Sequence, residues 1–157
     1  MKKLLEILAG ELSSITGMKK IISGFTIMAV LLIGGVSSGG DLSPEATVHK
    51  YFNALKNKQF EEAYNYVSQG MKGDRTREKW AEDWKKILEM GEVIILGFSV
   101  SAANIEGDTA TVRVSNRTTC LLDRKTNPNG VVEHEIDYLV KEKGAWKIDR
   151  TDVLIEE

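Results

Sequence analysis

The sequence predicts an α+β domain in which three N-terminal helices pack on a curved, four-stranded antiparallel sheet. Between Ser43 and Gly91, apolar side chains recur every three or four residues, which is typical of helices with one buried face. After Gly91 the apolar period becomes two, which is typical of strands. The strands need a cover for their apolar face, and the three helices are the available cover.

The first helix is predicted to begin at Ser43. The Ser43 hydroxyl can accept a hydrogen bond from a free helix amide, and Pro44 already has the φ angle of a helix. The apolar positions that follow have i, i+3, i+4, i+7 spacing: Val48, Tyr51, Phe52 and Leu55. The helix therefore has one face to bury.

Two more helices are expected before Gly91. After a break at Asn57-Lys58, a second apolar stripe begins at Phe60 and runs to Val67. Residues 68–74 contain two glycines and predict a loop. Thr76 can cap a third helix, which ends at Gly91. Its apolar face comprises Trp80, Trp84, Ile87 and Leu88.

Four strands follow, separated by turns near Gly107, at 127–130 and at Lys143-Gly144. The third strand, 132–140, alternates between apolar and acidic positions. We assign its apolar phase to the buried face: Val132, His134, Ile136, Tyr138 and Val140. The strand carboxylates are then expected to face outward: Glu133, Glu135, Asp137 and Asp149.

The N-terminus predicts export. Residues 1–20 form a basic, amphipathic leader, and residues 21–40 contain no charge and many apolar side chains. This pattern is typical of a signal peptide or a membrane anchor, and a start of translation at Met18 would also fit. Lysines precede the span, so the domain at 41–157 is expected outside the cytoplasm, at a bacterial cell envelope. An uncleaved span would hold it on the membrane.

Composition excludes several classes of protein. The formal net charge is −2, and no basic run occurs, so nucleic acid is not expected as a partner. The single cysteine, Cys120, excludes an internal disulfide. The two histidines form no metal-binding pattern with it, and no glycine-rich phosphate loop is present. We therefore expect neither a metal nor a cofactor.

The element order, the opening helix pair and the closing segment Gly144-Ala145-Trp146-Lys147-Ile148-Asp149 resemble the nuclear transport factor 2-like superfamily, to which ketosteroid isomerases and polyketide cyclases belong. The resemblance covers about residues 43–154. It implies a cone-shaped α+β fold, also called cystatin-like, with a pocket at the wide end. It implies no particular reaction, because this scaffold hosts enzymes, ligand binders and protein-binding modules.

An inferred strand register supplies candidate pocket residues. Pairing Leu122 with Val132 would place Cys120 opposite His134. Pairing Val140 with Trp146 would bring Arg150 to the same face. The candidates are Cys120, His134, Arg150, Thr118, Tyr138 and Trp84. A thiol beside an imidazole can act as a nucleophile, but we prefer a site that only orients a ligand.

We therefore predict a binding domain for a small apolar molecule or a protein partner, rather than an enzyme. A small enzyme of the isomerase or cyclase type is the first alternative, although carboxylates that face outward argue against it. A module that forms homodimers through its outer sheet face is the second. An outward patch of Val131, Leu139 and Val153 would indicate such a dimer.

Overall fold

The computed structural model describes residues 42–120 and 124–154. The predicted leader at 1–20, the predicted export or anchor segment at 21–40 and Leu122 lie outside the described residues. In these two ranges, no helix is both long enough and apolar enough to cross a membrane.

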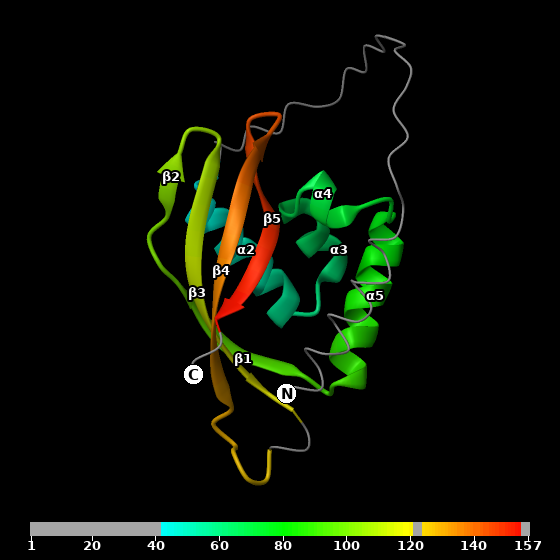
Figure 1. The fold of residues 1–157 in the computed structure, drawn as a ribbon. Helices are drawn as coiled ribbons and strands as arrows, with labels where there is room; N and C mark the ends of the chain where they lie inside the picture. Colours follow the sequence, from blue (N-terminus) through cyan, green and yellow to red (C-terminus); the bar gives the residue numbers. More distant parts are fainter. Residues whose placement is uncertain (1–41, 121–123, 155–157) are drawn as a thin grey trace. The chain divides into compact units, whose positions relative to one another are not determined.

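The fold is α+β, with the helices first and the sheet second, as the sequence predicted (Figure 1). The elements in chain order are α2 (Pro44–Lys56), α3 (Phe60–Ala63), the 3-10 helix η1 (Tyr64–Tyr66), α4 (Gln69–Lys72), α5 (Arg77–Met90), β1 (Ile94–Val100), β2 (Asn104–Glu106), β3 (Thr109–Thr119), β4 (Val131–Glu142) and β5 (Ala145–Leu154).

The described part of the sheet has five strands instead of the predicted four. The additional strand is β2, which occupies residues expected to form a turn and pairs with the beginning of β3. All strand pairs are antiparallel, and the main order is β1-β3-β4-β5. The turn itself is shorter than predicted, because only Gly107 and Asp108 separate β2 from β3.

The helices lie on one side of the sheet (Figure 1). Helix α2 packs against β1, β3 and β5, whereas α5 packs against α3 and η1. The predicted caps are confirmed: Ser43 Oγ accepts a hydrogen bond from the Ala46 amide at 3.2 Å, and Thr76 Oγ1 accepts one from the Lys79 amide at 3.2 Å. Each cap satisfies an amide that the helix leaves unpaired.

One hydrophobic core joins the helical half to the strand half. Its most deeply buried members come from α2, α5, three strands and the segment after η1: Val48, Trp80, Val112, Val114, Leu139, Val67 and Ile148. Val67 forms a parallel bridge with Ile148, and the Ser68 amide donates to the Ile148 carbonyl at 2.8 Å. The extended segment between η1 and α4 is thus fixed to the edge of β5.

The predicted inward face of β4 is wrong. Register pairs Val112 with Asp137 and Val114 with Glu135, and both valines are buried in the core. Glu135, Asp137 and Leu139 therefore face the helices, while the alternate residues, from Val132 to Val140 in steps of two, face away from them. The error arose because β4 has apolar side chains on both phases, and the outer phase has more of them.

The predicted hairpin registers are wrong too. Thr118 pairs with Val131, and Trp146 pairs with Lys141. A bulge in β5 leaves Asp149 between the pairs formed by Ile148 and Arg150. The exposed Asp149 accepts a hydrogen bond from Ser68 Oγ at 2.5 Å, at the sheet edge.

Candidate functional site

The structure places the predicted pocket residues on both faces of the sheet and beyond it. Thr118 faces the helices and is buried. His134 pairs with Ser115, with 2.9 Å between Ser115 Oγ and His134 Nδ1, so the register does not place it opposite Cys120. Tyr138 and Arg150 meet on the outer face, where the Arg150 guanidinium lies 4.0 Å from the center of the Tyr138 ring.

The two remaining candidates lie elsewhere. Cys120 follows the end of β3 and is half-buried. Trp84 is half-buried on α5, with its ring 5.7 Å from that of Trp80. The six residues therefore do not define one pocket.

The helix-facing side of the sheet instead holds a polar group that we call the inner polar cluster: Tyr51, Asn116, Glu135, Asp137 and Thr151. Helix α2 contributes the tyrosine, and β3, β4 and β5 contribute the others. Glu135 and Asp137 are two residues apart on β4, so their side chains leave the same face. Asn116 is two residues beyond the β3 partner of Glu135.

Several polar atoms of this cluster are buried without a partner. Asp137 is 0% exposed, and its Oδ1 accepts a hydrogen bond from Thr151 Oγ1 at 2.5 Å. Among the described residues, Asp137 Oδ2, Glu135 Oε1 and Asn116 Oδ1 have no hydrogen-bond partner. A buried polar atom left in this way costs about 1–3 kcal/mol. Three such atoms lie on the neighbouring strands β3 and β4.

Burial also changes the acidity of the two carboxyl groups. It raises the pKa of Glu135 to about 8, with further contributions from the charges of Asp137 and Glu133. It raises the pKa of Asp137 to about 6, although the Thr151 hydroxyl stabilises the ionised form. At neutral pH, Glu135 is therefore mostly a neutral acid that can donate a hydrogen bond, and Asp137 is mostly a carboxylate that can accept one.

Tyr51 adds a second neutral donor. Burial raises the pKa of its phenol well above the usual range, and the charges of Asp137 and Glu135 raise it further. The residue is 3% exposed on the helix side of the core. Its O–H group therefore keeps its proton at any physiological pH.

The side chains beside the cluster are aromatic and apolar. The Phe98 ring lies 5.4 Å from Phe52 and 5.1 Å from His49, and Phe98 pairs with Asn116 across the strands. At this end of the sheet, Phe98, Asn116 and Glu135 are half-buried, whereas Ala110 and Val112 at the other end are fully buried. The cluster thus lies where the dry core gives way to a more accessible region.

The sequence contained one clue to this site. Lys143-Gly144 is a two-residue turn, which pairs Glu142 with Ala145 and therefore Lys141 with Trp146. Counting back from that turn aligns Lys141 and Leu139 with the buried Trp146 and Ile148 of β5. Asp137 is two residues from Leu139, so its side chain leaves the same face. The predicted pairing of Val140 with Trp146 was one residue off and turned every β4 side chain to the other face.

Metal binding finds no support in the part of the chain that the structure describes. No three His, Cys, Asp or Glu side chains gather there closely enough to hold an ion.

Comparison with known proteins finds relatives by structure only. No protein-family model and no curated protein matches the chain. A SEC-C motif-containing protein from Rhodopseudomonas palustris is 18% identical, with a TM-score of 0.58 over 72% of this chain and 80% of that one. A ketosteroid isomerase-like protein from Erwinia carotovora atroseptica is 19% identical, with a TM-score of 0.50 over 71% and 94% of the two chains.

A domain of unknown function with a cystatin-like fold, from Nostoc punctiforme, is 12% identical, with a TM-score of 0.50 over 68% of this chain and 71% of that one. At these identities the similarity concerns the fold. The chain shares the α+β fold of these ketosteroid isomerase-like and cystatin-like proteins, and that is the fold the sequence predicted.

Proposed function

We propose that the domain at 41–157 binds a small, mainly apolar molecule through the inner polar cluster. The observation that carries this proposal is the group of three buried atoms without a partner: Asp137 Oδ2, Glu135 Oε1 and Asn116 Oδ1. A ligand carbonyl would accept hydrogen bonds from Glu135 or Tyr51, and a ligand hydroxyl would donate to Asp137. The neighbouring Phe52 and Phe98 rings suit an apolar body.

We place this binding domain outside the cytoplasm, at a bacterial cell envelope. The charge-free stretch at 21–40 and the lysines before it support that location. The domain would act there either tethered by this segment or released from it.

An enzyme of the isomerase type is the second candidate. A carboxylic acid that keeps its proton, beside a carboxylate that has lost one, is the pairing that proton transfer needs. The sequence-based argument against such an enzyme assumed that the strand carboxylates face outward. For Glu135 and Asp137 that assumption no longer holds.

Homodimer formation through the outer sheet face stays a prediction, with different residues. Leu139 is 1% exposed on the helix side, and Val131 and Val153 share its face. The side chains on the outer face of β4 are instead Val132, His134, Ile136, Tyr138 and Val140.

Native mass spectrometry of the full chain in a mild detergent tests the binding function. The wild type is expected to carry a small molecule, and Asp137→Asn and Glu135→Gln are expected to lose it. Asp152→Asn is the control, because this exposed carboxylate pairs with Arg150 on the other face. If the wild type carries no small molecule, or if all three variants retain it equally, the proposal fails.

Hydrogen–deuterium exchange of the bound molecule in the same sample distinguishes a binding protein from an enzyme. In the wild type, an isomerase would exchange an acidic C–H of the bound molecule with deuterated solvent. A binding protein would leave the molecule unlabelled.

A further inference from the structure

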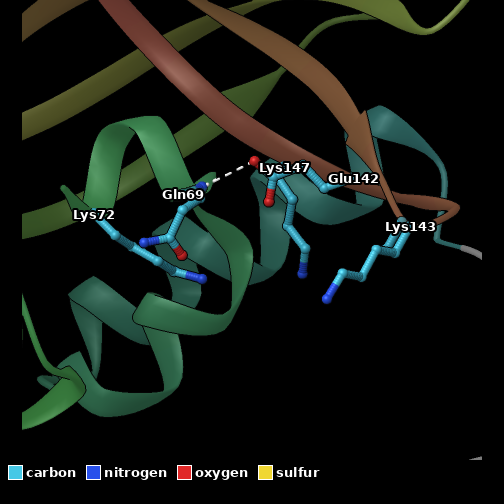
Figure 2. A pocket seen from close by; sticks show the side chains of 6 residues that line it. Gln69, Lys72, Glu142, Lys143 and Lys147 are labelled. Carbon is cyan, nitrogen blue, oxygen red and sulfur yellow. Dashed lines mark hydrogen bonds between the residues drawn. The ribbon is translucent and has the colours of Figure 1, made fainter. Parts of the chain in front are cut away.

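A second candidate site lies at the β4–β5 turn. An open depression of about 700 Å³ is lined there by Gln69, Lys72, Glu142, Lys143, Ala145 and Lys147 (Figure 2). Its volume is within the range of about 300–1,000 Å³ that is common for small-molecule sites. None of these residues belongs to the inner polar cluster.

Three lysines from separate elements meet at this depression. Lys72 comes from α4, Lys143 from the turn and Lys147 from β5. Figure 2 shows the ends of all three side chains turned toward the same open space. This arrangement is unusual for a domain in which Asp and Glu outnumber Lys and Arg.

The contacts of these lysines hold them in place without neutralising them. Lys147 Nζ donates to the Asn65 carbonyl at 2.5 Å, and Lys72 Nζ lies 4.4 Å from the center of the Tyr64 ring. Across residues 42–120 and 124–154, no carboxylate forms an ion pair with any of the three. The positive charges are therefore available to a ligand.

The one carboxylate in the depression already has a structural role. Glu142 Oε1 accepts a hydrogen bond from the Gln69 amide at 2.9 Å, which joins the β4 end to the beginning of α4 (Figure 2). This bond holds Lys72 and Lys143 on opposite sides of one space. The depression contains three ammonium groups and one carboxylate, so its net charge is positive.

Lys72 and Lys147 repel each other. Burial lowers the pKa of Lys72 and the positive charge of Lys147 lowers it further, whereas the negative charge of Glu142 raises it. Lys143 has φ 52°, a backbone conformation that Gly or Asn adopts more easily. An anion bound between the ammonium groups would relieve the repulsion.

We propose that Lys72, Lys143 and Lys147 form a binding site for a phosphate group. Lysine presents a compact, strongly hydrated charge with three donors, which suits the oxygens of phosphate. The phosphate can come from a soluble phosphate compound or from the headgroup of an anionic phospholipid. Both sources offer the same chemistry to the site.

The test uses the full chain in nanodiscs and follows the backbone amide resonances of Gln69 and Gly144. In phosphatidylcholine nanodiscs, inorganic phosphate is titrated at low salt. In parallel, phosphatidylcholine nanodiscs are compared with nanodiscs of equal parts phosphatidylcholine and phosphatidylglycerol. The variant is Lys143→Gln/Lys147→Gln, and the control Lys85→Gln/Lys86→Gln removes the same charge from exposed positions on α5.

A saturable shift with inorganic phosphate, weakened on the order of tenfold in the variant and unchanged in the control, supports a soluble source. A shift that appears only with phosphatidylglycerol and disappears in the variant supports the lipid headgroup. The absence of both shifts, or equal losses in variant and control, overturns the proposal. Lys143→Gln alone provides the same reading if the double variant unfolds.

Discussion

A single carboxyl group, Glu135, is expected to dominate the pH dependence of stability. Its pKa is about 8 in the folded protein, against an ordinary value of 4.5. Between these values the folded state holds a proton that the unfolded chain has released. The free energy of unfolding therefore falls as pH rises from about 4.5 to about 8. Asp137 acts in the same direction at lower pH, because its pKa is raised to about 6.

Glu135→Gln is expected to remove most of this dependence, since the amide needs no proton to stay neutral. At pH 8 the variant should be more stable than the wild type by roughly 2–4 kcal/mol, and at pH 5 the two should be similar. Urea unfolding at pH 5, 6.5 and 8 measures the difference. Glu61→Gln, at an exposed position, is the control. Parallel pH profiles for wild type and Glu135→Gln would contradict a buried, protonated Glu135.

At the scale of elements, the helices could be predicted because each has one apolar stripe and a clear cap. Ser43 and Thr76 cap α2 and α5 as expected, and Gly91 ends α5. A helix surrounded by solvent on its other faces keeps this pattern in its sequence. Local chemistry was sufficient there, even though the one-turn helix α4 was taken for a loop.

The positions of the main strands could be predicted from the sequence, but the face of β4 that is buried could not. Its inner phase includes Glu133, Glu135 and Asp137, and its outer phase includes Val132, Ile136 and Val140. A rule that buries the more apolar phase must fail on such a strand. The failure falls on the candidate site, because a site that binds polar groups needs polar side chains where a core would have apolar ones. Burial of those carboxyl groups depends on the packing of the helices over the sheet, which no local pattern contains.

At the β4–β5 turn, Lys143 is expected to lower the stability of the fold and to contribute to phosphate binding. Lys143 and Gly144 both have positive φ, 52° and 85°, as a type I′ turn requires. Asn adopts this conformation more readily than Lys, so Lys143→Asn should stabilise the fold by about 0.5 kcal/mol. Thermal unfolding followed by circular dichroism measures this effect. The same variant should bind inorganic phosphate more weakly, and a loss of stability would contradict the turn assignment.

At the scale of the whole domain, the helical half and the strand half depend on one core. Val48 of α2 is 0% exposed, and α2 contacts three strands. Neither half can keep its apolar face dry alone, so residues 42–154 are expected to unfold as one cooperative unit. The tryptophans allow both halves to be followed, since Trp80 lies in α5 and Trp146 in β5.

Val48→Ala should therefore destabilise both halves equally, by about 1–3 kcal/mol, because it leaves a cavity between α2 and the sheet. Val132→Ala is the matched control, since this valine is 43% exposed on the outer face and should cost less than about 0.5 kcal/mol. Single-tryptophan versions of each variant, retaining Trp80 or Trp146, report urea unfolding of each half by fluorescence. Coincident transitions that shift together confirm a shared core. Separate midpoints for Trp80 and Trp146 would mean that the sheet is stable without the helices. In that case the helices would unfold first, and the burial that raises the pKa values of Glu135 and Asp137 would be lost before the sheet unfolds.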